Sequence, residues 1–325
     1  MVFVLKLLVG LFCVGALGVV ALFLLGPREP GVRNTVLVTS QIGLDIDAYL
    51  TAKEERLDDI WPGVEKEVIW ADAPGVQTEF AVVYIHGWSA TKEELRPVPD
   101  RLAAALGANL FYTRLSGHGR TGQALADAEA SDWVLDAQEA LEIGRRIGKK
   151  VILFGTSTGG TLVAELLAKE SRATDIAGAV LVSPNFRIKD PASLVLTFPY
   201  GRRLVEAIIG KTRSWQGQNA LHTKYWTNVY PSVAVVPLAV LVKHVRKRDF
   251  AAIRTPALFI YTLKDDVVEQ RETERIMAKW GGEVTRFQPD FTDDPKGVHV
   301  LAGDIISPSR TTPVADAIIA WAKGL

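Results

Sequence analysis

Residues 151–160, with the sequence V-I-L-F-G-T-S-T-G-G, constrain the fold more than any other stretch of the chain. The four apolar residues predict a short buried strand, and the apolar spacing after Gly160 predicts a helix. Between them Gly155-Thr156-Ser157-Thr158-Gly159 matches G-x-S-x-G, the pattern of a serine on a sharp turn from strand to helix. Such a turn exposes the hydroxyl of Ser157 at the edge of a sheet, which predicts a nucleophile. A plain Gly-Ser-Thr turn is the competing interpretation.

Strands and helices alternate along the chain on both sides of this turn. Residues 80–85, F-A-V-V-Y-I, are almost wholly apolar, as in a strand that is covered on both faces. The other predicted strands are 67–71, 109–115, 178–182, 256–262 and 283–288. The other predicted helices are 45–60, 93–106, 131–147, 269–280 and 313–322, and Asp45 is the predicted cap of the first of them. This alternation predicts an α/β fold with a doubly wound, mostly parallel sheet.

The alternation is interrupted between residues 184 and 254, about seventy residues that lie between two predicted core strands. This stretch contains several aromatic residues and a helix-like run, 232–248, that includes Pro237. A helical cap, inserted over the carboxyl edge of the sheet, fits better than a loop. We therefore expect a core built from residues 44–183 and 255–325, with residues 184–254 as the cap.

Residues 7–25 form an uninterrupted apolar run that would span about 30 Å as a helix, the thickness of the hydrocarbon core of a bilayer. We expect residues 1–26 to be a membrane anchor and residues 27–43 to be a linker with few groups for packing. A cleaved signal peptide is the alternative, but the run exceeds a usual signal core and no small-x-small site follows it.

Positively charged residues flank the apolar run on both sides, so they give little preference for either orientation in the membrane. Lys6 precedes the run, and Arg28 and Arg33 follow it. The short amino-terminal tail resembles the basic region of a signal sequence, which favours a catalytic domain outside the cytoplasm.

The overall charge and the cysteine content exclude several kinds of partner. The chain has 37 basic and 37 acidic residues, so its formal net charge is zero and a nucleic acid is not expected as a partner. Its one cysteine, Cys13, excludes an internal disulfide and a cysteine-rich metal site. Neither a metal nor an organic cofactor is implied.

A serine nucleophile needs a base to take its proton and an acid to orient that base. On this type of fold the order along the chain is serine, acid, histidine. The acid is expected directly after the strand at 256–262, where Asp265 and Asp266 occur, and His299 is the only histidine beyond that point. We expect Asp266 to cap the following helix, which leaves Asp265 to orient His299.

The oxyanion of an acyl-transfer reaction needs backbone N–H donors. We expect them from Thr158, directly after the nucleophile, and from Trp88, in the loop H-G-W that follows the strand at 80–85. His86 and His118 lie near the same edge of the sheet, and we expect both to be structural.

The chain resembles the α/β-hydrolases, and within them the branch of monoacylglycerol lipases, carboxylesterases and serine aminopeptidases. The motifs that carry this resemblance are V-V-Y-I-H-G-W, R-L-S-G-H-G-R, F-G-T-S-T-G-G, L-K-D-D-V-V and G-V-H-V-L, spread from about residue 65 to the end of the chain. One departure is the loop H-G-W, where lipases and esterases of this type have H-G-G-G.

The resemblance and the order of the motifs together predict a serine hydrolase that cleaves carboxylic esters through an acyl-enzyme. The apolar composition of the cap predicts a small-molecule ester with an apolar acyl group as the substrate. A peptidase or amidase of the same fold is the first alternative, and a non-catalytic binding protein is the second.

A basic stretch, K-H-V-R-K-R at 243–248, follows the apolar run of the cap. One interpretation is a solvated helix end, where the helix dipole favours cations. The other is a contact with anionic lipid beside the anchor.

Overall fold

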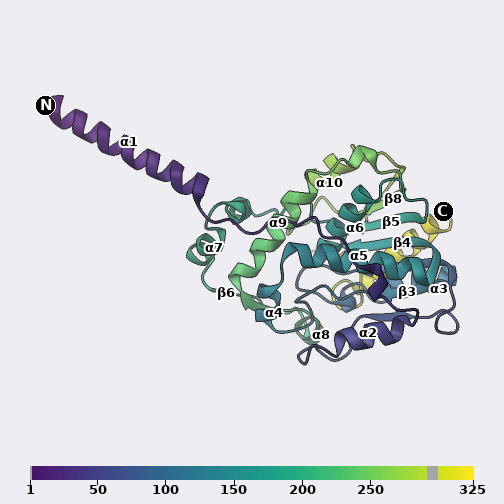
Figure 1. Cartoon of the computed structure of the whole chain (residues 1–325). Coiled ribbons are helices and arrows are strands. Elements are labelled where there is room, and N and C mark those ends of the chain that lie inside the picture. The colour runs from purple at the N-terminus through teal and green to yellow at the C-terminus, as the bar shows by residue number, and fades with distance from the viewer. Residues whose placement is uncertain (1, 291–298) are drawn as a thin grey trace.

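The computed structural model of the chain describes residues 2–290 and 299–325 (Figure 1). Within these residues seven strands form one sheet in the order β1-β3-β2-β4-β5-β8-β9. β1 is antiparallel to β3, and every other neighbouring pair is parallel. The strands are β1 (Glu67–Ile69), β2 (Thr78–Ile85), β3 (Asn109–Tyr112), β4 (Gly148–Thr156), β5 (Ile176–Val182), β8 (Ala257–Ile260) and β9 (Val284–Phe287).

Helices cover both faces of the sheet, as the sequence predicts. α5 (Ala130–Ile147), α6 (Thr158–Lys169) and α10 (Gln270–Met277) pack on one face, and α3 (Val98–Leu106) and α11 (Pro308–Ala322) pack on the other. Neighbouring strand residues point to opposite faces, so Val83 joins the first core cluster and Val82 the second. The prediction of a doubly wound, mostly parallel sheet is confirmed.

Several element boundaries differ from the prediction. α2 (Ile46–Glu54) is capped by Asp45, as expected, but ends before Ile60. The helix predicted at 93–106 is divided into the 3₁₀ turn η2 (Lys92–Glu94) and α3, because Pro97 between them lacks an N–H to continue a helix. The expectation that Asp266 caps the next helix is wrong. Glu269 caps α10 and accepts the N–H of Arg271, since the chain makes another turn before the helix begins.

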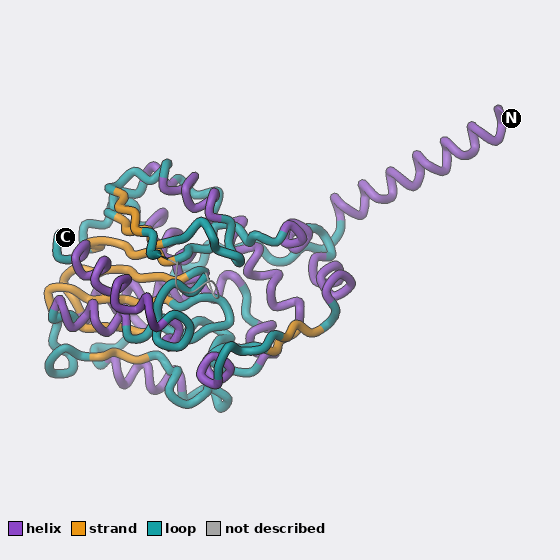
Figure 2. The backbone as a smooth tube through the Cα atoms, turned by 180° about the vertical axis from the view of Figure 1, so that it is seen from behind, coloured by secondary structure: helices purple, strands orange, loops and turns teal. Residues whose placement is uncertain are grey.

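The cap lies between the sheet and the amino-terminal helix (Figures 1 and 2). Its elements are η3 (Pro191–Thr197), α7 (Gly201–Ile209), β6 (Thr212–Ser214), α8 (Ala220–Tyr225), β7 (Val229–Pro231), η4 (Ser232–Ala234), α9 (Val235–Val245) and η5 (Phe250–Ala252). β6 and β7 pair as a small antiparallel sheet, and α4 (Gly122–Asp127) packs beside them. Pro237 falls in the first turn of α9, where it does not interrupt a helix. Leu241 and Val245 of α9 belong to the main core.

α1 (Val2–Leu25) projects away from the domain, and the segment after it returns along α5 (Figure 1). The Arg33 N–H donates to the Ser131 hydroxyl at 3.0 Å, and the Leu37 N–H donates to the Gln138 side chain at 3.0 Å. Ile42, after the short turn η1 (Thr39–Gln41), is buried in the main core. Residues 27–43 therefore pack on the domain more than their composition predicts.

Candidate active site

Ser157 lies on the tight turn between β4 and α6 with backbone angles φ 51° and ψ −112°. A non-glycine residue at positive φ is strained, and this strain is typical of functional turns. A Cβ on Gly155 would lie 2.4 Å from the carbonyl oxygen of Gly159, and a Cβ on Gly159 would lie 1.9 Å from that of Ile85. The turn can therefore form only with glycine at both positions of G-x-S-x-G.

The structure brings Ser157, His299 and Asp265 together, although Ser157 and His299 are 142 positions apart in the sequence. Nε2 of His299 lies 2.9 Å from Oγ of Ser157, and Nδ1 of His299 lies 2.8 Å from Oδ2 of Asp265. Residues 297 and 298 of the predicted G-V-H-V-L motif lie outside the described residues.

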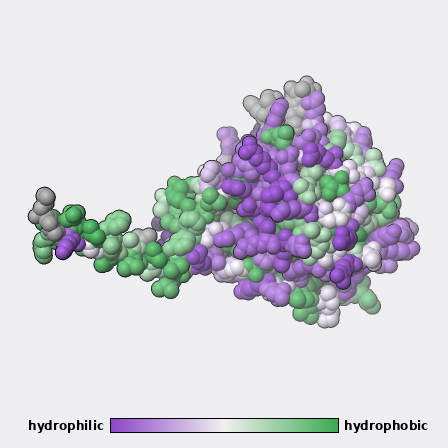
Figure 3. Space-filling view, turned by 90° about the horizontal axis from the view of Figure 1, so that it is seen from above, coloured by the Kyte–Doolittle hydropathy of each residue, from purple (hydrophilic) through white to green (hydrophobic). Residues whose placement is uncertain are grey.

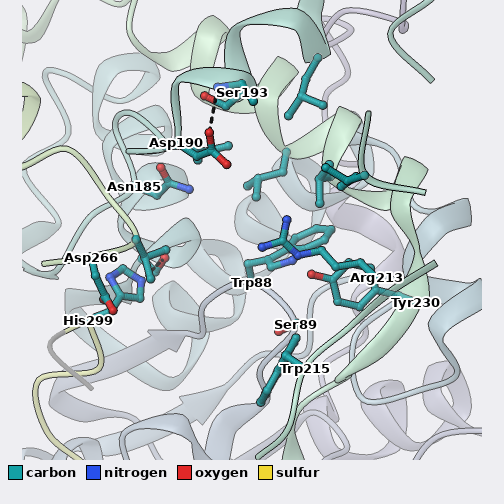
Figure 4. A pocket seen from close by; sticks show the side chains of 18 of the residues that line it. Trp88, Ser89, Asn185, Asp190, Ser193, Arg213, Trp215, Tyr230, Asp266 and His299 are labelled. Carbon is teal, nitrogen blue, oxygen red and sulfur yellow. Dashed lines mark hydrogen bonds between the residues drawn. The ribbon is translucent and has the colours of Figure 1, made fainter. Parts of the chain in front are cut away.

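The backbone distinguishes Asp265 from Asp266. The second carboxylate oxygen of Asp265 accepts the N–H groups of Val267 at 2.8 Å and Val268 at 2.9 Å, which holds the first oxygen against His299. Asp265 is buried, whereas the side chain of Asp266 lines the neighbouring pocket (Figure 4).

The surroundings of His299 favour its protonated form. Burial by itself lowers the pKa of the imidazole, but the charge and hydrogen bond of Asp265, with smaller contributions from Glu94 and Asp266, raise the pKa above its ordinary value. Such a histidine can take the proton of the Ser157 hydroxyl and hold it as an imidazolium ion.

The two residues that the sequence predicts as oxyanion donors, Thr158 and Trp88, lie near Ser157. Thr158 is the first residue of α6, where backbone N–H groups have no partner within the helix. The N–H of Gly87 donates to Glu94 at 2.6 Å, and Trp88, which carries the next N–H along the loop, lines the cavity together with Ser157. The close approach of Gly159 to Ile85 brings this loop beside the turn.

Glu94 is a buried residue of the site that the sequence analysis did not identify. Besides the N–H of Gly87, its carboxyl group accepts the hydroxyl of Tyr84 at 3.3 Å, and it lines the pocket beside His299. Burial raises the pKa of Glu94 to about 7, against the opposing effect of the Gly87 hydrogen bond. In the sequence Glu94 looks like one more charged residue of a surface helix, so no local signal marks it.

Ser183 is the second residue that the sequence analysis missed. It follows β5 with φ 43°, and its hydroxyl donates to the carbonyl oxygen of His299 at 2.7 Å. Its position directly after a core strand is the only sequence signal that indicates a residue at the site edge.

His86 and His118 are structural, as expected. Nε2 of His86 accepts the N–H of Leu115 at 3.1 Å, and its Nδ1 lies 2.9 Å from the carbonyl oxygen of Gly87. Burial lowers the pKa of His86 well below its ordinary value and that of His118 to about 4, which favours the neutral form of both rings. They support the loop that carries Trp88, whose ring packs on His118 at 5.5 Å.

A cavity of about 530 Å³ between the cap and the sheet opens onto Ser157 and His299 (Figure 4). This size suits a small-molecule ligand. Ser157 and His299 line the end near the sheet together with Asn185, which is buried and whose side-chain oxygen has no hydrogen-bond partner among the described residues. The cap also contributes the polar side chains of Asp190, Ser193 and Arg213 and the aromatic rings of Trp215, Trp226 and Tyr230. Its aliphatic side chains along the cavity include Val195, Leu196, Val205, Ile208, Ile209 and Leu238.

Contacts with glutamates involve three of the five basic residues at 243–248. His244 and Arg248 contact Glu165 of α6, and Arg246 contacts Glu272 of α10. These contacts connect the end of α9 to α6 and α10. Lys243 instead donates to the hydroxyl of Thr197 in η3 at 3.3 Å.

A serine on a strained strand-to-helix turn, beside a histidine and a buried aspartate at the edge of a doubly wound sheet, defines the class of α/β-hydrolases. The model of the family described as "Alpha/beta hydrolase family" matches residues 82–303. The chain belongs to this family.

Solved structures with the same fold include several lipases. One of the metagenome-derived lipolytic enzymes LipS and LipT matches with a TM-score of 0.64 and 20% identity, over 82% of this chain and 100% of that chain. The monoacylglycerol lipase of Paleococcus ferrophilus matches with a TM-score of 0.57 and 16% identity, over 79% and 97%. A soluble variant of monoglyceride lipase from Saccharomyces cerevisiae matches with a TM-score of 0.55 and 12% identity, over 91% and 98%. No curated protein matches the sequence.

Proposed function

We propose that this protein is a membrane-anchored serine hydrolase that cleaves carboxylic esters. The observation that carries the proposal is the chain of hydrogen bonds from Ser157 through His299 to Asp265, at 2.9 Å and 2.8 Å. Two bonds in this order allow one proton to move between a nucleophile and a base while the acid keeps the base oriented.

The reaction proceeds through an acyl-enzyme. Nε2 of His299 takes the proton of Ser157 as Oγ attacks the ester carbonyl, and the N–H groups of Trp88 and Thr158 bind the oxyanion. His299 then returns the proton to the leaving alcohol as the bond between carbonyl carbon and alkoxy oxygen breaks. Water, activated by the same histidine, hydrolyses the acyl-enzyme and restores Ser157.

The shape and lining of the cavity support an ester with an apolar acyl group. Most of the cap side chains that line the cavity are apolar, and each buried methylene of an acyl chain would stabilise the complex by about 0.8 kcal/mol. The structures of similar fold that are described as lipolytic enzymes or monoglyceride lipases support the same substrate class. A peptidase or amidase with the same triad is the second candidate function.

The anchor is supported by the composition of α1. The helix segment Phe3–Leu25 has a mean hydropathy of 2.8, none of its side chains that the structure describes is buried, and 23 residues are enough to cross a bilayer. In this proposal residues 1–26 span the membrane, residues 27–43 connect them to the domain, and the catalytic domain lies outside the cytoplasm. The core then comprises residues 44–183 and 255–325, with residues 184–254 as its cap.

Hydrolysis of p-nitrophenyl esters of graded chain length, run beside aminoacyl anilides, tests the proposed activity. We expect kcat/KM to rise from acetate to medium chains until the cavity is filled. We also expect a fluorophosphonate probe to label the wild type and not Ser157→Ala. Efficient anilide cleavage with a flat ester profile would favour the peptidase, and labelling of another serine would contradict the site.

A further inference from the structure

Large apolar side chains are exposed on the cap where α1 joins the domain. They are Leu194 (54% exposed), Phe198 (40%), Ile208 (54%) and Ile209 (42%), from η3, the turn after it and the end of α7. We call these four residues the junction patch. Figure 3 shows hydrophobic residues gathered at this end of the domain, continuous with α1, whereas hydrophilic residues cover much of the rest of that face.

The end of α1 is attached to the same part of the cap. The rings of Phe23 and Phe198 meet edge to face with centroids 5.5 Å apart. The Tyr200 N–H donates to the carbonyl oxygen of Pro27 at 2.7 Å, and Arg202 forms two hydrogen bonds of 2.7 Å with Glu29. These contacts place the junction patch at the depth of the last turn of α1. If α1 spans a bilayer, this turn lies at the bilayer surface.

Three exposed cations, Arg28, Arg203 and Lys243, contact residues beside the junction patch. Arg28 donates to the carbonyl oxygen of Phe23 at 2.9 Å, the guanidinium of Arg203 lies 5.9 Å from the centre of the Tyr200 ring, and Lys243 contacts η3 through Thr197. Among the described residues none of these three cations forms an ion pair with a carboxylate. Apolar side chains bordered by basic ones match the boundary between acyl chains and anionic headgroups.

The cap elements that expose the junction patch also line the cavity with aliphatic side chains. Val195 and Leu196 of η3 and Val205 of α7 face the cavity. Ile208 and Ile209 belong both to the cavity lining and to the junction patch, so the rim of the cavity lies within the patch.

We infer that the junction patch rests on the bilayer that α1 spans, and that the acyl chain of the substrate enters the cavity from the bilayer past Ile208 and Ile209. The inference rests on the proposed anchor and the proposed ester hydrolysis. A lipid surface is the occupant, rather than a second protein, because the patch is continuous with the apolar surface of α1 and bordered by unpaired cations.

The depth of the patch can be measured on the full chain in vesicles of phosphatidylcholine and phosphatidylglycerol. Cys13→Ser removes the native thiol, and a single cysteine at Leu194 or Val76 then carries an environment-sensitive fluorophore. Val76 is the matched control, since it is 51% exposed and lies at the amino end of β2, away from the cap. We expect the label at Leu194 to be blue-shifted and quenched by nitroxide lipids, and the label at Val76 to be neither. Equal signals at the two sites would overturn the inference, as would a shielded Leu194 label that nitroxide lipids do not quench, which would indicate a protein partner.

Substrate entry is tested with Leu194→Asp and, as its control, Val76→Asp. Neither residue lines the cavity, so we expect both variants to cleave a short water-soluble ester at the wild-type rate. On a long-chain ester embedded in vesicles, Leu194→Asp should be slower by about fivefold or more, because a charge on the patch weakens its contact with lipid. Equal rates on the vesicle ester would overturn the inference. If the wild type does not cleave the soluble ester, the proposed ester hydrolysis is contradicted. The contact of the junction patch with the bilayer is still tested in that case, because the fluorescence measurement does not depend on activity.

Discussion

The carboxyl group of Glu94 accepts the backbone N–H of Gly87 at 2.6 Å, one residue before Trp88. A Cβ on Gly87 would lie 2.6 Å from the nearer oxygen of Glu94, so the loop and the carboxyl group are packed directly against each other. Glu94 therefore holds the loop whose next N–H group we assign to the oxyanion.

In the Glu94→Gln variant, the unfolding free energy should depend less on pH than in the wild type. Burial raises the pKa of Glu94 from 4.5 to about 7, so the folded state holds this proton more tightly than the unfolded state. The resulting stabilisation is complete below about pH 4.5 and is lost as the pH rises to about 7. Over this interval the wild type should lose about 3 kcal/mol of unfolding free energy relative to the variant. Urea unfolding at several pH values measures the difference, with the exposed Glu79→Gln as the control; parallel curves for wild type and Glu94→Gln would contradict it.

Asp265→Asn should lower kcat far more than Asp266→Asn. An amide at position 265 cannot balance the charge on His299 and can impose the wrong tautomer, a change that costs about 10⁴-fold in serine proteases. Asp266 makes no hydrogen bond to His299, so its variant should lose less than about tenfold. Ester hydrolysis by the two purified variants compares them, and the reverse order would exchange the roles of the two residues.

Ser183→Ala should reduce kcat by leaving the carbonyl oxygen of His299 without its donor. An unsatisfied buried acceptor destabilises the folded state by about 1–3 kcal/mol. If the backbone of His299 shifts to find another donor, its imidazole moves away from Ser157 and kcat falls. Steady-state kinetics and thermal unfolding separate the two effects, with Ser183→Thr as the variant that retains the hydroxyl. Lower stability with unchanged kcat would restrict Ser183 to a structural role.

Gly159→Ala should abolish activity or folding, because its Cβ would lie 1.9 Å from the carbonyl oxygen of Ile85. Gly31→Ala is the control, since no atom lies within 4 Å of its added Cβ. Soluble yield and fluorophosphonate labelling measure both variants. Normal labelling of Gly159→Ala would show that the turn and the loop after β2 can separate without loss of the site.

If α1 spans the membrane, the full chain should stay in the membrane pellet after a carbonate wash. A chain without residues 1–26 should be soluble and active, because it retains the contacts of Pro27 with Tyr200 and of Glu29 with Arg202. Immunoblotting of pellet and wash, with amino-terminal sequencing, measures this. Release of the full chain would indicate peripheral attachment, and a mature amino terminus near residue 27 would indicate a signal peptide.

The sequence alone determined the fold class and the identity of the turn that carries Ser157. Apolar runs, helical periodicity and G-x-S-x-G are local patterns, and local backbone preferences are sufficient to read them. The order of serine, acid and histidine also selected His299, because no other histidine follows the predicted acid.

The tertiary structure decided which side chains meet at the site. Asp265 and Asp266 have the same chemistry and adjacent positions, and only the N–H groups of Val267 and Val268 turn one of them toward His299. The hydrogen bond of Ser183 to the carbonyl oxygen of His299 joins residues 116 positions apart, and the ion pair of Arg248 with Glu165 joins residues 83 positions apart. No local periodicity encodes such contacts, because they depend on how the sheet and its helices pack in three dimensions.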